Sequence, residues 1–436
     1  MLYPMSLIEQ MTVLGQRAKA ASRELARLDT ERRNTALLAM ADALDANSAR
    51  LAAANALDIE AALASGLPAP MVDRLRLTPA RIAAMTKGIR EVAALPDPVG
   101  RVLDERVRPN GLRLRKIATP IGVVVIIFES RPNVTADAAS LCFKSGNATI
   151  LRGGREALNS NRLIAAIMAE AAHDAVPETP TDAIQLVDTT DREAIPALLS
   201  LTDYVDLCMP RGGEGLIRAV TACSKVPVIK HYKGVCHVYV HAAANLEMAR
   251  RIVTNAKTQR PAVCNAMETL LVDGSVAEAF LRLLLPDLLS QKVQIRADTE
   301  SFAFLQSAAA ADPANAADWL RTATEEDYRT EYNDLIMNLK VVPGLAEAID
   351  HINTRGSAHS DSIVTSDETA AARFLAEVDS SAVYWNASTR FTDGGEFGMG
   401  AEIGISTDKI GARGPMGLEE LTTYKWLGYG TGQVRV

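Results

Sequence analysis

The stretch VVVIIFESRPN, residues 123–133, indicates the fold class of this 436-residue chain. Its first six residues, Val123 to Phe128, form an unbroken apolar run, and polar residues follow from Glu129. A short apolar run that ends in polar residues and a proline is typical of a strand buried on both faces. Similar runs, several of them separated by helical patterns, lie at residues 148–151, 183–186, 205–209 and 235–240. Strands that alternate with helices predict an α/β fold with a parallel, doubly wound sheet.

Polar clusters follow three of these strands, at the sheet edge where such folds bind ligands. The first contains Arg131, the second is Arg152-Gly153-Gly154-Arg155, and the third, residues 210–215, contains Gly212, Gly213 and Gly215 before a helix. Glycines let the backbone approach a phosphate, a helix start offers free N–H groups, and arginine binds phosphate with two donors. Neither glycine cluster is GxGxxG, so each alone also fits a tight turn beside a solvated arginine. Their repetition at successive strand ends favours a bound nucleotide.

The segment before the first strand contains helical patterns and one polar hairpin. Residues 6–28, 34–65 and 79–94 carry Ala and Leu at helical spacing, which predicts amphipathic surface helices. Residues 101–116 change to alternation, with Asn110-Gly111 as a hairpin turn signal. Because the hairpin has many charges and little apolar surface, it fits either an arm that reaches a second subunit or a solvent-exposed ribbon.

Cys264 lies in a polar, cationic stretch, TNAKTQRPAVCNAMET, residues 254–269. A helical pattern ends near Lys257, Pro261 begins an irregular segment, and an apolar strand pattern follows at residues 268–273. This arrangement predicts a loop that presents the cysteine sulfur between two regular elements, as catalytic side chains often are. Lys257 and Arg260 are nearby cations that could stabilise a thiolate. For an isolated cysteine, a buried apolar filler is the alternative.

Composition restricts the class of protein. The length predicts two or three domains, and the charged fraction of 23% is that of a globular protein. A net charge of −7 with dispersed Lys and Arg argues against nucleic-acid and membrane-surface partners and favours small molecules. The five cysteines are odd in number and widely spaced, with no CxxC pair, which fits a reducing compartment and predicts neither a disulfide framework nor a zinc or other metal site. We therefore expect a cytoplasmic location.

Longer motifs resemble a known family. Residues 119–135, 144–154, 228–234, 255–264, 404–407 and 411–418 closely resemble the gamma-glutamyl phosphate reductases, the proline-biosynthesis branch of the aldehyde dehydrogenase superfamily. The resemblance implies an NADPH-binding domain (residues 1–105 and 118–254), a catalytic domain (255–414) and an oligomerisation arm (106–117 and 415–436). It also implies NADPH-dependent reduction of L-glutamate 5-phosphate to L-glutamate 5-semialdehyde. As partners it implies other copies of the chain in a homo-oligomer, and it is compatible with binding to the upstream glutamate kinase.

The resemblance further assigns roles to residues. Cys264 carries over as the nucleophile that forms a thioester, and Asn133 as a candidate for the oxyanion site, although a helix cap is an equal alternative for Asn133. His231-Tyr232-Lys233-Gly234 stands where hydrolytic relatives have a deacylating glutamate, so the thioester should be discharged by hydride and not by water.

Cofactor and substrate contacts are further expectations. Arg152 and Arg155 favour the 2′-phosphate of NADPH, although Glu156 counts against it, and Glu331 resembles the residue that binds the nicotinamide ribose. Arg131 and Arg413 are candidates for binding the substrate α-carboxylate. A hydrolytic aldehyde dehydrogenase and a non-catalytic nucleotide-binding protein are the rival functions.

Overall fold

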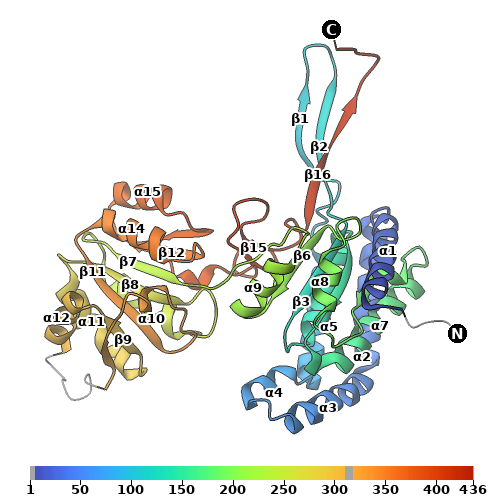
Figure 1. The fold of residues 1–436 in the computed structure, drawn as a ribbon. Helices are drawn as coiled ribbons and strands as arrows, with labels where there is room; N and C mark the ends of the chain where they lie inside the picture. The colour runs from blue at the N-terminus through green and yellow to red at the C-terminus, as the bar shows by residue number, and fades with distance from the viewer. Residues whose placement is uncertain (1–4, 310–317, 436) are drawn as a thin grey trace. The chain divides into compact units, whose positions relative to one another are not determined.

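The computed structural model describes residues 5–309 and 318–435 of the chain (Figure 1). These residues form two compact units, each assembled from separate chain segments. The first unit comprises Met1–Lys230, Gly398–Gly404 and Met416–Val436, and the second comprises His231–Phe397 and Ile405–Pro415.

The first unit contains the predicted parallel sheet. Its strand order is β5-β4-β3-β6, and every neighbouring pair is parallel: β3 (Val123–Phe128), β4 (Ala148–Arg152), β5 (Ile184–Leu186) and β6 (Leu207–Arg211). All six residues of β3 are buried, as its apolar run predicts. Val123, Val125 and Ile127 share one core cluster with residues of α1 (Leu7–Leu25), α8 (Ala194–Leu199) and α9 (Glu214–Cys223). The helices α6 (Asn133–Lys144) and α7 (Leu158–Ala175) contact the strands β3, β4 and β5. The predicted α/β fold is confirmed.

The helices of the first unit agree with the predicted helical patterns, with one division. They are α1 (Leu7–Leu25), α2 (Thr30–Ala46), α3 (Ser48–Ala64), α4 (Ala69–Leu75), α5 (Pro79–Ala94), α6 (Asn133–Lys144), α7 (Leu158–Ala175), α8 (Ala194–Leu199) and α9 (Glu214–Cys223). The pattern at residues 34–65 is two helices, because Asn47 leaves helical geometry at φ −99° and ψ 15° and ends α2. No helix among the described residues is long and apolar enough to cross a membrane.

A three-stranded antiparallel ribbon also belongs to the first unit (Figure 1). β1 (Val102–Val107) and β2 (Arg113–Pro120) form the predicted hairpin, and Gly111 in its turn has a φ of +83° that favours glycine. β16 (Thr422–Tyr429) pairs with β2 along its whole length, so the C-terminal strand adds to the hairpin of its own chain. The end of the described chain lies beside the turn, where Gln433 Nε2 donates a hydrogen bond to the Asn110 carbonyl at 3.1 Å.

The second unit is built on a seven-stranded, wholly parallel sheet, with the order β10-β9-β11-β8-β7-β12-β13. Its strands are β7 (Cys236–Val240), β8 (Met267–Asp273), β9 (Gln294–Ala297), β10 (Leu320–Thr322), β11 (Ile336–Val342), β12 (Ser360–Val364) and β13 (Ala382–Trp385). Its helices are α10 (Leu246–Thr258), α11 (Ala277–Ser290), α12 (Thr299–Ala308), α14 (Leu345–Arg355) and α15 (Glu368–Glu377). Two short strands, β14 (Gly404–Ser406) and β15 (Gly414–Met416), form a separate pair.

The resemblance implies a catalytic domain that begins at residue 255, and this domain division stays a prediction. The second unit begins at His231, because β7 pairs with β8 and β12 and not with the strands of the first sheet. β7 and α10 therefore belong with Cys264 and not with the glycine and arginine clusters.

Candidate active site and cofactor cavity

Cys264 lies in a loop of the second unit, as predicted. The loop joins the end of α10 at Thr258 to the start of β8 at Met267, and the cysteine is half-buried. The adjacent Asn265 fixes the loop, because its Nδ2 donates to the Thr392 carbonyl at 2.8 Å and its carbonyl accepts from Thr389 Oγ1 at 2.7 Å. The backbone of the cysteine is thereby held while its side chain keeps some access to solvent.

A second set of contacts holds the Cys264 carbonyl. Cys236 Sγ donates to it at 3.2 Å, and a Cβ added at Gly234 would lie 1.7 Å from its oxygen. Only glycine therefore fits at position 234. The N–H of Gly234 donates to Glu331 Oε1 at 3.0 Å, so the carboxylate expected to bind a ribose instead braces the backbone beside the cysteine in this structure.

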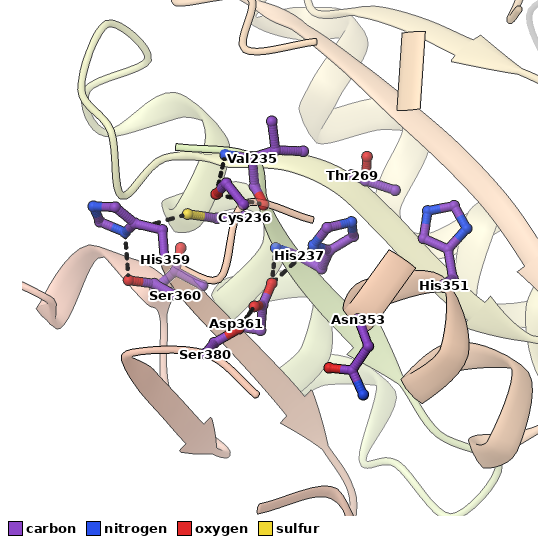
Figure 2. A network of polar contacts seen from close by, with 12 residues as sticks. Val235, Cys236, His237, Thr269, His351, Asn353, His359, Ser360, Asp361 and Ser380 are labelled. Carbon is purple, nitrogen blue, oxygen red and sulfur yellow. Dashed lines mark hydrogen bonds and ion pairs between the residues drawn. The ribbon is translucent and has the colours of Figure 1, made fainter. Parts of the chain in front are cut away.

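Two histidines lie beside Cys264. Each of His231, Cys264 and His359 has a nitrogen or sulfur atom within 4.8 Å of those of the other two. His231 Nδ1 faces the Ile405 carbonyl at 2.9 Å, so this nitrogen must carry the proton. His359 is fully buried, and its Nδ1 lies 2.8 Å from Ser360 Oγ (Figure 2). Burial and the neighbouring His231 lower the pKa of His359 to about 3, so its ring is neutral at physiological pH.

Arg390 is the cation that the structure places near the cysteine. Burial and then Arg260 lower the pKa of Arg390, whereas negative charge on Cys264 would raise it, so the guanidinium and the sulfur are electrostatic neighbours. Its Nε donates to Gln259 Oε1 at 2.8 Å. The sequence pattern did not single out Arg390; the only signal was its position between the β13 strand pattern and a glycine-rich loop.

Lys257 does not serve the cysteine in this structure. Its Nζ lies 2.8 Å from Glu268 Oε2, and both side chains are completely buried. Burial lowers the pKa of Lys257 and raises that of Glu268, while their attraction opposes both changes. Lys233 is also occupied elsewhere, because its Nζ donates to the Arg329 carbonyl at 2.6 Å.

A buried polar network lies next to His359 (Figure 2). Asp361 Oδ1 accepts from both the backbone N–H and Nδ1 of His237 at 2.8 Å, and Ser380 Oγ donates to its other oxygen. These contacts fix β7 against β12, and therefore fix the chain segments that carry His231 and His359.

The first unit contains a cavity of about 510 Å³ at the carboxyl ends of its strands. Arg152, Arg155 and Gly215 all line it, which brings together three of the predicted cofactor residues. Arg192, which the sequence pattern did not indicate, lines it as well. Arg152 is buried, donates to the Gly153 carbonyl at 2.6 Å, and has a buried Nε without a hydrogen-bond partner in the structure.

Carboxylates share this cavity. Glu156 lines it and accepts from Ser130 Oγ, and Glu129 Oε2 accepts from the Gly213 N–H at 3.1 Å. A Cβ at Gly212 would lie 2.7 Å from the Glu129 carboxyl carbon, whereas Cβ atoms at Gly213 and Gly215 would meet nothing within 4 Å. A side chain at position 212 would therefore displace the ends of the Glu129 and Leu216 side chains in the turn before α9.

Asn133 is the first residue of α6, with Pro132 at the cap position and no side-chain cap hydrogen bond. Its Nδ2 donates to Asp137 Oδ2 at 2.9 Å, so its side chain is not a helix cap here. Burial raises the pKa of the Asp137 carboxyl to about 6, and the Asn133 hydrogen bond only partly opposes this.

The two arginines suggested for the substrate carboxylate lie in different units. Arg131, in the first unit, is exposed in the loop before α6, where its N–H donates to the Glu129 carbonyl at 2.5 Å. Arg413, in the second unit, pairs with Asp379 at 2.8 Å. Asn133 and Arg131 are thus placed in one unit, and Cys264, Glu331 and Arg413 in the other.

Comparison with known proteins agrees with these features. Residues 6–334 match the model of the aldehyde dehydrogenase family. The chain is 53% identical over 98% of its length to gamma-glutamyl phosphate reductase of Opitutus terrae, of which 99% is covered. It is 52% identical over 99% of its length to the same enzyme of Moorella thermoacetica, covered completely. The crystal structure of gamma-glutamyl phosphate reductase from Thermotoga maritima is similar with a TM-score of 0.93 and 41% identity, covering 98% of this chain and all of that one.

Proposed function

This chain belongs to the aldehyde dehydrogenase family and, within it, to the gamma-glutamyl phosphate reductases, and from this membership we propose how its residues carry out the reaction. The protein reduces L-glutamate 5-phosphate to L-glutamate 5-semialdehyde and phosphate, a step of proline biosynthesis. The main support for this function is the 53% identity to a named reductase over 98% of the chain. It agrees with a half-buried cysteine held in the loop where the motif places it.

The cavity of the first unit fits a phosphorylated nicotinamide cofactor. Arg155 and Arg192 line it as cations, and the buried Nε of Arg152 has no protein partner. A 2′-phosphate would supply acceptors to this set, which favours NADPH over NADH. Ser130 bonds to Glu156, the carboxylate that would oppose this choice. When bound, NADPH supplies the hydride that reduces the acyl group.

Cys264 performs the covalent steps in this proposal. Its thiolate attacks the acyl carbon of the substrate, the C–O bond to phosphate breaks, and an acyl thioester remains on the sulfur. Arg390 stabilises the thiolate, because a cation beside the sulfur favours its charged form. Reduction gives a hemithioacetal, whose C–S bond then breaks to release the aldehyde and restore the cysteine. Asn133 remains our candidate for stabilising the oxyanion, once its amide leaves Asp137.

His231 stands where a deacylating carboxylate would act in a hydrolytic relative. Because its Nδ1 donates to the Ile405 carbonyl, the ring presents Nε2 on its other side. Such a ring can donate to a departing phosphate only when doubly protonated, and the stretch His231-Tyr232-Lys233-Gly234 has no carboxylate to activate water. We therefore propose that the thioester is discharged by hydride. Arg131 and Arg413 remain the proposed contacts of the substrate α-carboxylate. For Arg413 the substrate carboxylate would have to replace Asp379 as its ion-pair partner.

The reverse reaction tests this function. Glutamate semialdehyde, phosphate and NADP⁺ should give NADPH at a rate that depends on phosphate, and Cys264→Ala should stop turnover while NADPH still binds. Phosphate-independent turnover would instead identify a hydrolytic aldehyde dehydrogenase. Nucleotide binding without turnover in the unmodified protein would identify a non-catalytic nucleotide-binding protein.

We further propose that the ribbon of the first unit joins subunits. β16 is an edge strand with exposed aromatic side chains, namely Tyr424, Trp426 and Tyr429, and an open strand edge is a ready partner for another chain. Light scattering should give a mass above that of one chain, and a monomer at working concentration would remove this proposal. We also propose that the upstream glutamate kinase associates with this protein in the cytoplasm and passes its acyl phosphate product on, because an acyl phosphate is easily hydrolysed.

A further inference from the structure

Three potential metal ligands meet at the proposed nucleophile. One donor atom each of His231, Cys264 and His359 lies within 4.8 Å of the other two. In tetrahedral zinc sites with two nitrogens and one sulfur, bond lengths near 2.1 and 2.3 Å place such donors about 3.4 to 3.6 Å apart. Closure therefore needs donor shifts of about 1 Å. His231 and Cys264 are only half-buried and can move more readily than the fully buried His359.

The environment of both rings fits the way histidine binds a metal. Metal-binding histidines usually donate their second ring N–H to an oxygen, which fixes the tautomer and the ring orientation. His231 Nδ1 donates to the Ile405 carbonyl at 2.9 Å, so a metal would take the lone pair of Nε2. Ser360 Oγ donates to Thr392 Oγ1 at 2.7 Å, so its lone pairs accept from His359 Nδ1 at 2.8 Å (Figure 2).

The remaining nitrogen of His359 has no assigned role. His359 is completely buried, and its Nε2 has no hydrogen-bond partner in the structure. A buried polar atom without a partner is costly and calls for an explanation such as an ion. The cluster that His359 forms with a half-buried cysteine and a second imidazole offers one, namely a metal ion.

We propose that His231, Cys264 and His359 form an inhibitory binding site for a borderline-soft divalent cation, with zinc as the best fit. The proposal rests on Cys264 being the nucleophile of the proposed function. Binding exchanges the thiol proton for the metal, so Cys264–SH and Zn²⁺ give a Cys264–S–Zn unit and a released proton. The sulfur lone pair is then engaged, and attack on the acyl phosphate stops. A water or a phosphate oxygen completes the fourth position.

The ligand set also predicts which ions act. Thiolate and imidazole suit Zn²⁺ and Co²⁺, whereas Mg²⁺ and Ca²⁺ prefer oxygen ligands. Micromolar zinc should inhibit reversibly, with recovery on addition of a chelator, while millimolar magnesium should leave turnover unchanged. Zinc should also protect Cys264 from iodoacetamide, as measured by mass spectrometry of the peptide that contains it.

Cobalt gives a readout independent of activity. Titration of the full-length protein with Co²⁺ should produce a thiolate-to-cobalt charge-transfer band that saturates at one equivalent, and prior alkylation of Cys264 should abolish it. If cobalt gives no thiolate band, or if the band survives alkylation of Cys264, the proposal is wrong. This result is separate from the proposed function, which fails if turnover is absent or independent of phosphate, or if Cys264→Ala remains active.

His359→Asn tests the buried ligand. This variant keeps a polar side chain beside Ser360, and the zinc concentration that gives half-maximal protection of Cys264 from iodoacetamide should rise about tenfold or more. His351→Asn is the matched control, because His351 is another buried histidine of this unit whose Nε2 has no partner, and it is not part of the cluster. Equal zinc sensitivity and equal protection of Cys264 in His359→Asn and the unmodified protein would overturn the proposal. If His359→Asn does not fold, the cobalt and protection experiments on the unmodified protein decide.

Discussion

Gly234 lies against the backbone of Cys264 so closely that a Cβ at position 234 would come within 1.7 Å of the Cys264 carbonyl oxygen. Gly234→Ala should therefore displace the cysteine loop and reduce kcat about a hundredfold, because misplacement by about 1 Å has effects of this size. NADPH binding and overall folding should be retained, as measured by fluorescence titration and circular dichroism. Gly274→Ala is the control, since its Cβ would make only ordinary contacts at 3.7 Å or more. A Gly234→Ala enzyme with normal kcat would contradict this contact.

Arg390 is predicted to control the reactivity of Cys264. Arg390→Met removes the cation near the sulfur, so a smaller share of the cysteine should be thiolate at pH 7. Alkylation of Cys264 by iodoacetamide at pH 7 should slow by about tenfold. The difference should vanish at high pH, where the Cys264 thiol is fully ionised in both the variant and the unmodified protein. Arg373→Met, which removes a surface arginine paired with Glu377, should not change the rate. Equal alkylation rates in Arg390→Met and the unmodified protein would exclude this role.

Arg155 is predicted to select the cofactor. Arg155→Gln keeps a polar side chain in the cavity but loses the charge, so KM for NADPH should rise about tenfold or more. Turnover with NADH should change little, because NADH has no 2′-phosphate. Arg162→Gln is the control, since Arg162 pairs with Asp188 and does not line the cavity. A parallel loss with both cofactors would show that Arg155 acts on a shared part of them.

The buried pair of Lys257 and Glu268 is predicted to act on stability. Lys257→Met leaves the Glu268 carboxyl buried without its partner, which should cost about 3 to 5 kcal/mol in denaturant unfolding. The double variant Lys257→Met/Glu268→Leu should recover much of this loss, because it removes both charges. Alkylation of Cys264 should remain unchanged in the double variant. Slower alkylation there would restore Lys257 as a cation that serves the cysteine.

Asp137 should give the first unit a pH-dependent stability. Its folded pKa of about 6 lies above the ordinary value of 3.8, so between these values the folded protein holds a proton that the unfolded chain has lost. The contribution of this group to stability therefore falls as pH rises through this window and is constant above it, with a total change of about 3 kcal/mol.

Asp137→Asn removes this titration. Relative to the unmodified protein, the melting temperature of the variant should increase between pH 4.5 and pH 6.5 and then stay level. Scanning calorimetry at several pH values measures the difference directly. A difference that is independent of pH would contradict the raised pKa of Asp137.

The elements that the sequence could predict are those with a local signal. β3 is a complete apolar run, Asn110-Gly111 defines its hairpin, and the loop of Cys264 is marked by Pro261 and the following strand. Strand pairing has no such signal. The apolar run of β7 fits either parallel sheet, because strands buried on both faces have the same composition, and only its pairing with β8 and β12 assigns it to the second unit.

The candidate site could be predicted only in part, for a similar reason. Cys264 has a motif, and the arginines of the cavity lie at strand ends, but His359 and Arg390 are distant from Cys264 in sequence and reach it through the fold. Lys257 is close to Cys264 in sequence, yet its direction is set by Glu268 on the buried face of β8. Proximity along the chain therefore does not show which way the Lys257 side chain points, whereas Arg260, the other nearby cation, stays a prediction.

The discontinuous first unit has a consequence for the order of events during translation. The ribosome completes β1, β2 and the four-stranded sheet first, then the whole second unit, and only afterwards β16, whose Thr422 and Tyr429 pair with Pro120 and Arg113. Since domains tend to fold as they emerge, the hairpin must wait with one open edge while the second unit is made. A ribosome that stalls before residue 422 therefore holds a nascent chain in which both parallel sheets have been synthesised. In that chain the edge of β2 that later pairs with β16 is still open.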